Sequence, residues 1–274
     1  MNYKPLRMHR LFPHESQKSL FLPIDHGTTL GPLKGLVNVP KLVSDVQTNH
    51  YQAVIAHKGV IQSLMRYPEL RKMEYILHLS ASTSMGSDAS FKQQVTSVEH
   101  ALRLGVSGIS LHTNLGVMHE HRMLREFGEI CDTAYKWGLP VLVMMNVAKE
   151  ENTLSDSSHG RKIAHAVRIA GEMGADMVKV ECPDNLESLP DIINSFDIPI
   201  FIAGGIETKS KVSWFESLEM CLNAGARGLC IGRNVFEDEN PFAMSLALKS
   251  LVHDQKSASQ AYELYTNTDV LITS

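Results

Sequence analysis

Cysteine is scarce in this sequence, and its arrangement excludes two kinds of site. Of 274 residues only four are cysteines, and no two of them form a CxxC pair. Disulfide frameworks and zinc ribbons both need a regular set of cysteines, so we expect neither. Free thiols in a reducing cytosol explain the four cysteines better than a disulfide framework or a zinc ribbon does. The four are Cys131, Cys182, Cys221 and Cys230.

The sequence also lacks a basic excess and long apolar segments. Its net charge is -4 and its pI is about 6.3, so its charge does not favour binding to a nucleic-acid backbone. The first residues, MNYKPLRMHRLFPHESQ, hold no apolar core of signal-peptide length, and no apolar run reaches the length that crosses a membrane. We therefore expect a cytoplasmic protein with no nucleic acid and no membrane as partner.

Short apolar runs recur along the chain at the spacing of βα units. They are apolar on both faces, as are parallel strands that helices cover. Helical patterns at residues 90–104, 161–173 and 212–224 lie between several of the runs, and a glycine follows each pattern. The runs lie at residues 19–27, 51–59, 74–82, 106–114, 139–146, 175–183, 198–205 and 226–234.

Eight such units predict an α/β fold, a (β/α)8 TIM barrel. The alternative is a doubly wound open sheet, but the first run ends in DHG instead of the GxGxxG of a dinucleotide-binding sheet. We expect a single domain over residues 1–274, with an N-terminal cap at 1–18, the barrel at 19–253 and a C-terminal tail at 254–274. The polar loop at 148–160 would then lie over the end of the barrel where active sites form.

A lysine lies inside the sixth apolar run, ADMVKVECP. Strand alternation places Met177, Lys179 and Glu181 on one face and the two valines on the other, so the lysine points into the barrel. A poorly solvated ammonium loses its proton more readily, and a neutral amine can attack a carbonyl to form a Schiff base. From this feature alone two interpretations stay open: a nucleophile, or a structural lysine paired with Asp25 or Glu181.

The last two runs end in glycine-containing motifs, IAGGIET and CIGRNVFE. Glycine lets the backbone approach a ligand closely, and barrels often hold a phosphate in the loops after strands seven and eight. Arg233 adds a charged donor to this region. Together with Lys179, these motifs predict a phosphorylated carbonyl substrate.

Several motifs resemble one known family. PIDHG, HLSASTS, PVLVMMN, IAGG and IGRNVF are similar to the class I aldolases of the archaeal fructose-bisphosphate aldolase superfamily. The nearest branch is that of the 2-amino-3,7-dideoxy-threo-hept-6-ulosonate synthases and the related 2-amino-4,5-dihydroxy-6-oxo-7-(phosphonooxy)heptanoate synthases. The similarity covers roughly residues 15–253. It implies a carbon–carbon lyase or ligase that adds a phosphorylated ketone or ketose to an aldehyde, aspartate semialdehyde in the nearest relatives.

The resemblance also implies roles for individual residues. Lys179 matches the Schiff-base lysine and Asp25 the acid/base carboxylate. The phosphate-binding positions are Gly204, Gly205, Gly232 and Arg233. The family needs no metal or other cofactor for this chemistry, and its members form pentamers or decamers, so the resemblance implies a homo-oligomer.

Two departures from the family pattern stand out. Where relatives read MMYPRG, this chain reads MMNVAKE, so Asn146 replaces a tyrosine that serves as general acid/base. Asparagine donates hydrogen bonds but exchanges no proton near neutral pH. Where relatives read VKTPYTGD, this chain reads VKVECPDN. His57, Lys149 or Glu181 could take over the proton transfer, and we favour His57 because its ordinary titration range is near neutrality.

Other functions stay open at this point. A thiolase-like or sugar-phosphate-aldolase-like relative could carry an altered acid/base set on the same barrel. A metal-dependent barrel enzyme could use histidines at the strand ends, although the sequence has no HxH or HExxH motif. A non-catalytic relative is the remaining alternative, against which stand the retained Lys179 and Asp25.

Overall fold

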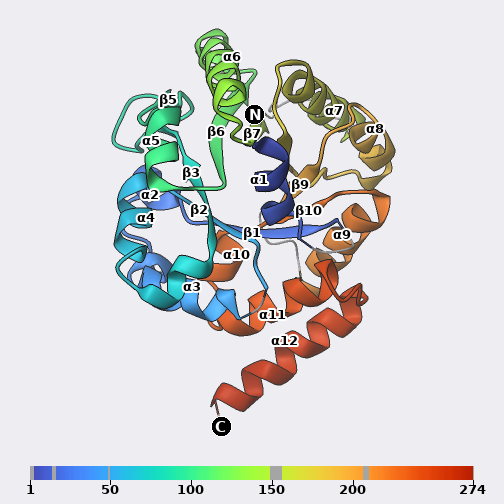
Figure 1. Cartoon of the computed structure of the whole chain (residues 1–274). Helices are drawn as coiled ribbons and strands as arrows, with labels where there is room; N and C mark the ends of the chain where they lie inside the picture. Colours follow the sequence, from blue (N-terminus) through green and yellow to red (C-terminus); the bar gives the residue numbers. More distant parts are fainter. Residues whose placement is uncertain (1–2, 14–16, 49, 149–155, 206–209, 274) are drawn as a thin grey trace.

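The computed structural model describes residues 3–13, 17–48, 50–148, 156–205 and 210–273. Eight parallel strands close into a barrel in the order β1-β10-β9-β8-β7-β6-β3-β2, with helices around it (Figure 1). The predicted (β/α)8 barrel is therefore confirmed. Its strands are β1 Ser19–Pro23, β2 Ala53–Ala56, β3 Glu74–His78, β6 Gly108–Leu115, β7 Val141–Val147, β8 Met177–Glu181, β9 Ile200–Ala203 and β10 Gly228–Cys230.

The remaining elements surround this barrel. A small antiparallel hairpin, β4 Ser80–Ala81 with β5 Gln93–Gln94, extends from the end of β3. The α-helices are α1 Lys4–Leu11, α2 His26–Leu30, α3 Val39–Gln47, α4 Lys58–Leu64, α5 Val98–Leu104, α6 Glu120–Trp137, α7 Asp156–Glu172, α8 Leu189–Ile193, α9 Lys211–Ala224, α10 Arg233–Phe236, α11 Pro241–Val252 and α12 Ala258–Thr273. Short 3-10 turns lie at Lys34–Leu36, Pro68–Lys72 and Leu186–Ser188.

Alternation along the strands divides the apolar residues into two cores. On β8, Val178 and Val180 belong to the outer core between the barrel and its helices, whereas Met177 belongs to the core inside the barrel. This is the division that the sequence pattern predicts for the strand. The next inward-facing residue of β8 after Met177 is therefore Lys179.

The prediction of a helix over residues 90–104 is wrong in its first half. Helix α5 begins only at Val98, because Ser97 adopts an extended conformation and its hydroxyl accepts a hydrogen bond from the backbone N–H of His100. Upstream, Gln93 and Gln94 form β5, and Val95 is about half exposed. The apolar spacing that suggested one helix therefore spans a hairpin strand and a shorter helix.

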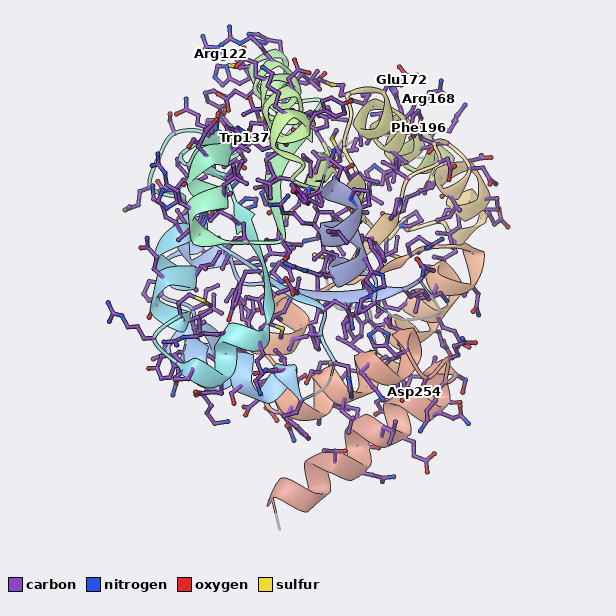
Figure 2. The ribbon with its side chains drawn as sticks, in the orientation of Figure 1. Arg122, Trp137, Arg168, Glu172, Phe196 and Asp254 are labelled. Carbon is purple, nitrogen blue, oxygen red and sulfur yellow. The ribbon has the colours of Figure 1, made fainter. Side chains whose placement is uncertain are left out.

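The predicted helices at residues 161–173 and 212–224 are confirmed as α7 and α9. The glycines that follow α5, α7 and α9 all have positive φ, which ends a helix without steric cost. On the outer surface, charged side chains such as Arg122 and Asp254 point away from the barrel (Figure 2). Arg168 pairs with Glu172 one turn later and lies over the ring of Phe196.

Helix α1 lies across the end of the barrel where the strands begin (Figure 1). Its last residue, Leu11, and the following Phe12 enter the inner core, where Phe12 and Phe21 contact the ring of Phe201. Lys4 binds the Asp176 carboxylate at 3.0 Å, and this carboxylate also accepts the backbone N–H of Val141. Apolar side chains therefore fill the barrel interior at this end.

The C-terminal helix α12 packs on α9 and α11 and then extends beyond the body of the protein (Figure 1). No helix in the described part of the chain has the length and apolar character needed to cross a membrane.

Candidate active site

Lys179 lies inside the upper part of the barrel, half-buried on β8. Strand pairing places it level with Met144 on β7, and Met144 level with His112 on β6. Among the described residues, Lys179 has no hydrogen bond or ion pair. The pairing with Asp25 or Glu181 that would make it a structural lysine is therefore not formed, and Glu181 instead contacts His159 at 2.9 Å.

Asp25 follows β1 and is 8% exposed. Its Oδ2 lies 3.7 Å from Nε2 of His78 and its Oδ1 lies 3.8 Å from Nδ1 of His26. Burial alone would raise its pKa, but attraction to the protonated forms of His78, His26 and His112 and to Lys179 outweighs burial and holds the pKa well below its usual range. Asp25 is therefore an ionised carboxylate within the electrostatic reach of Lys179.

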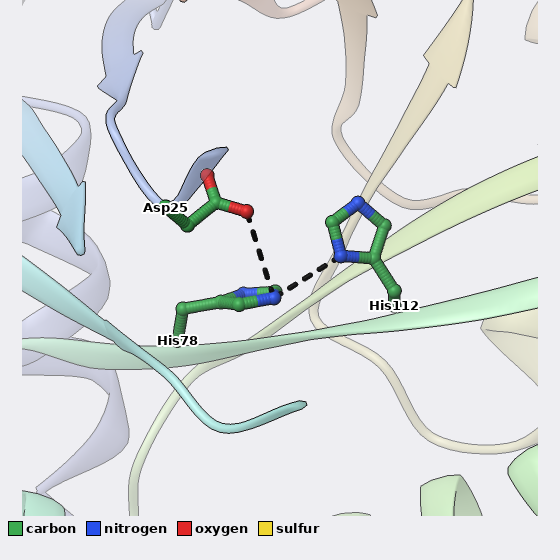
Figure 3. A group of neighbouring side chains, drawn as sticks. All are labelled: Asp25, His78 and His112. Carbon is green, nitrogen blue, oxygen red and sulfur yellow. Dashed lines mark hydrogen bonds and ion pairs between the residues drawn. The ribbon is translucent and has the colours of Figure 1, made fainter. Parts of the chain in front are cut away.

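Two histidines from neighbouring strands form a hydrogen-bonded pair beside Asp25 (Figure 3). Nε2 of His78 lies 3.1 Å from Nδ1 of His112, and Nδ1 of His78 lies 2.8 Å from the hydroxyl of Ser110. Burial lowers the pKa of His78 to about 4 and lowers that of His112 well below its usual value. Both rings are therefore neutral at physiological pH.

His57 lies at the end of β2, with its ring against that of His78 at a centroid distance of 5.2 Å. Burial lowers its pKa, while Asp25 and a hydrogen bond with the backbone of His78 act in the opposite direction. The structure thus brings His57 to the same group of side chains as Asp25. In the barrel order, however, β2 stands four strands from β8 in either direction.

The ligand atoms of Asp25, His78 and His112 lie within 4.8 Å of one another, close enough for a divalent metal ion. Two ammonium groups argue against such an ion. Both Lys179 and Lys92 lower the pKa of His78 and of His112, so both place positive charge where the ion would sit. The donor set fits a metal in spacing but not in charge.

Lys92 is a candidate site residue that the sequence pattern does not reveal. It is half-buried, and its ammonium donates to the hydroxyls of Ser82 at 2.6 Å and Thr29 at 3.1 Å. Burial lowers its pKa, partly offset by the attraction of Asp25. No motif marks it, and it lies in the stretch at residues 90–104 whose apolar spacing predicts a helix. The β4–β5 hairpin brings it to the mouth of the barrel.

The predicted phosphate-binding residues lie after β9 and β10, as expected for the last two units. Gly205 has a φ of 67°, and it lines a pocket of about 550 Å³ together with Arg233, Asn234 and Lys211 and with three acidic residues, Glu237, Asp238 and Glu239. A side chain at Gly204 would collide with Asn234, and one at Gly232 would collide with the backbone of Pro23. These two glycines allow close packing of the strand ends, whereas Gly205 and Arg233 face open space.

The two sequence departures lie at the rim. The amide of Asn146 is exposed and donates to Oδ1 of Asn114 at 2.9 Å, and the Asn114 amide in turn donates to the carbonyl of Ser90. The thiol of Cys182 lies 3.5 Å from that of Cys221. Lys149 and most of the loop predicted to lie over this face fall outside the described residues, as do residues 206–209.

Comparison with known proteins extends these observations. Residues 19–238 match the model of the DeoC/LacD aldolase family. The chain is 30% identical over 259 residues to a 2-amino-4,5-dihydroxy-6-oxo-7-(phosphonooxy)heptanoate synthase of Streptomyces griseus, covering 94% of this chain and 93% of that protein. It is 32% identical to a 2-amino-3,7-dideoxy-D-threo-hept-6-ulosonate synthase of Halobacterium salinarum, with 94% of each chain covered.

Solved structures show the same likeness. An archaeal fructose 1,6-bisphosphate aldolase superposes with a TM-score of 0.79 at 25% identity, covering 91% of this chain and 98% of that one. A Schiff base forming fructose-1,6-bisphosphate aldolase superposes with a TM-score of 0.78 at 25% identity, covering 91% of this chain and all of the other. From the match over residues 19–238 and these relatives, the chain belongs to the DeoC/LacD family of aldolases and is an enzyme of the class I aldolase type.

Proposed function

We propose that Lys179 forms a Schiff base with a phosphorylated ketone or ketose, and that the resulting enamine adds to an aldehyde. The observation that carries this proposal is the setting of Lys179. Its side chain is half-buried within the upper barrel, has no hydrogen bond or ion pair with any described residue, and feels the Asp25 carboxylate. A lysine in such a place is free to attack a carbonyl carbon.

Asp25 serves the steps that form the Schiff base. Attack by the amine gives a carbinolamine, and loss of water from it gives an iminium ion. As an ionised, buried carboxylate, Asp25 can accept a proton during these steps and stabilise the positive iminium nitrogen. The residues that surround it keep it ionised, which suits a group that stabilises a positive iminium nitrogen.

The phosphate end of the substrate has a candidate position at the ends of the adjacent strands, β9 and β10. Gly205 and Arg233 face the pocket after β9 and β10, and β9 is the immediate neighbour of β8. Gly204 and Gly232 keep the strand ends close enough for this arrangement. Lys92 adds a second cation at the barrel mouth for an acidic group of either reactant.

The acceptor and the assembly are proposed from the family that the sequence resembles. Ulosonate and phosphonooxyheptanoate synthases are among the proteins similar to this chain, and from that resemblance we propose aspartate semialdehyde as the aldehyde. We further propose a cytoplasmic homo-oligomer, a pentamer or decamer, as in the family that the sequence resembles. The reaction itself needs no metal or other cofactor in this scheme.

A second candidate function has one specific observation in its favour. The chain is also 30% identical over 262 residues to a 3-hydroxy-5-phosphonooxypentane-2,4-dione thiolase of Photorhabdus laumondii, covering 94% of this chain and 85% of that protein. Asn146, in place of the tyrosine of the aldolases, is compatible with a changed reaction on the same lysine. A thiol acceptor therefore belongs in the assay beside the aldehyde.

Borohydride trapping tests the proposal. The protein is incubated with a panel of phosphorylated ketones and ketoses, reduced, digested and examined by peptide mass. We expect an adduct on Lys179, abolished in Lys179→Met. Lys58→Met is the matched control, because Lys58 follows β2, four strands from β8, and donates to the carbonyl of Val95; it should keep the adduct. An adduct that persists in Lys179→Met contradicts the proposal.

A further inference from the structure

His112 presents one ring nitrogen to the interior of the upper barrel. Its Nδ1 bonds to His78, while its Nε2 is turned away from that ring and has no partner among the described residues (Figure 3). The side chain is only partly buried, so a substrate can reach it. Through Met144, His112 is level with Lys179, two strands away. Neighbouring strands are about 4.8 Å apart, so the two side chains rise from the same part of the barrel wall, two strand spacings apart, with Met144 between them.

His78 and Ser80 hold the ring of His112 in place. Nε2 of His78 contacts Nδ1 of His112, and the hydroxyl of Ser80 accepts the backbone N–H of His112 at 2.8 Å. His78 is itself fixed by Ser110 at its other nitrogen, at 2.8 Å. A histidine whose Nδ1 is bonded in this way presents Nε2 in a defined direction.

Asn146 cannot supply the proton transfer that its position suggests. It is two residues beyond Met144 on β7, so it points into the same space from the rim. Its amide is engaged with Asn114, and an amide exchanges no proton near neutral pH. The group that exchanges protons with the substrate must therefore come from another strand.

We propose that His112 is the catalytic acid/base of the enamine steps and that His78 positions it. The inference rests on the proposed Schiff base at Lys179. Nε2 of His112 removes a proton from the carbon next to the iminium, and the electron pair of that C–H bond forms the enamine. The enamine carbon then bonds to the aldehyde carbon, the C=O π pair moves to oxygen, and Nε2 of His112 returns the proton to that oxygen.

The electrostatics of the cluster support this cycle. Burial holds the pKa of His112 well below its usual value, so the ring begins neutral with a lone pair available. When Nε2 gains a proton, Nδ1–H donates to Nε2 of His78. The Asp25 carboxylate, 3.7 Å from Nε2 of His78, then offsets the new positive charge.

His57 is the competing candidate. Its ring packs against His78, but it sits on β2, on the side of the barrel opposite Lys179. His112 is two strands from Lys179, whereas β2, which His57 follows, is four strands from it. The geometry therefore favours His112.

The deciding variant is His112→Asn. An asparagine amide occupies the place of Nδ1 and can keep the bond to His78, while the exchanging Nε2 is lost. The two readouts are the borohydride adduct on Lys179 and the rate of deuterium exchange at the substrate carbon next to the carbonyl, followed by NMR. We expect an undiminished adduct and an exchange rate lower by about 100-fold or more. His78→Gln should lower exchange by about tenfold with the adduct kept, as expected of a positioning residue.

His57→Asn tests the competing candidate directly. His9→Asn, on the exposed face of α1 at the other end of the barrel, is the control and should exchange within about threefold of the unaltered protein. Exchange retained in His112→Asn, or lost in His57→Asn alone, overturns the inference, as does loss of the adduct in His112→Asn. If His112→Asn does not fold, His112→Gln gives the same readout, because its amide also exchanges no proton. Absence of any adduct in the unaltered protein refutes the proposed function instead, so the two failures are distinguishable.

Discussion

The two ends of the barrel interior are built from the same strands but hold opposite kinds of side chain. Where the strands begin, Phe12, Phe21 and Phe201 pack together beneath helix α1; we call this group the floor. Where the strands end, Asp25, His78, His112 and Lys179 face one another; we call this group the polar cluster. On β8 the change occurs within two residues, from Met177 to Lys179.

The contrast shows that residues for stability and residues for catalysis lie at opposite ends of the barrel interior. The floor is apolar and buried, so its contribution to stability comes from packed apolar area. The polar cluster buries ionisable groups, which opposes folding unless they pair or stay neutral. Altering each end in turn should therefore separate loss of stability from loss of activity.

The sharpest test of the contrast compares Phe21→Ala with Lys179→Met. Phe21 is fully buried and stacks on Phe201 at a centroid distance of 4.3 Å, so its truncation should lower the free energy of unfolding by about 3–5 kcal/mol. Lys179→Met removes an ammonium with no bonded partner and should leave stability unchanged or higher. Urea unfolding measures both changes. A folded Phe21→Ala protein should still form the Lys179 adduct, and a destabilised Lys179→Met protein would break the contrast.

The polar cluster should also make stability depend on pH. Burial lowers the pKa of folded His78 to about 4, below an unfolded value of about 6.5. Between these values only the unfolded chain binds the proton, so the free energy of unfolding should fall by about 3 kcal/mol as pH falls from 6.5 to 4. Asp25 affects stability in a lower pH range. Because its pKa is lowered in the folded protein, the stabilisation that it gives is lost only below its unfolded pKa near 3.8.

Urea unfolding at several pH values measures this loss. His78→Gln should reduce the decline between pH 6.5 and 4, whereas His9→Gln, on the exposed face of α1, should leave it intact. An unchanged decline in His78→Gln would mean that the cluster is not the source of the pH dependence.

The smallest expected effect concerns the ion pair that joins α1 to the residue before β8. Lys4 binds Asp176 at 3.0 Å with both side chains only partly buried, so Lys4→Met should cost about 0.5–1 kcal/mol. Asp176→Ala should cost about 1–3 kcal/mol, because it also leaves the N–H of Val141 without its acceptor. Thermal unfolding of the two variants checks this order. A larger loss in Lys4→Met would mean that the floor depends on the ion pair more than on its aromatic packing.

Much of the architecture could be predicted from local patterns. Apolar runs, helical spacing and the glycines that end helices act over a few residues, so they placed all eight barrel strands and two of the three predicted helices. The failed helix at residues 90–104 shows the limit. Its apolar spacing was real, but Ser97 starts the helix late, and the preceding residues pair with β4 to form a hairpin that no local pattern announces.

The sequence by itself determined which strand carries the lysine and which end of the barrel holds the polar groups, because side-chain alternation and strand direction follow from order along the chain. Only the tertiary structure decided which of those groups meet. His78 and His112 are 34 residues apart in the chain but have ring nitrogens 3.1 Å apart, and Lys92 reaches the same mouth through a hairpin. Barrel closure and strand register set these distances, and both depend on the packing of the whole chain.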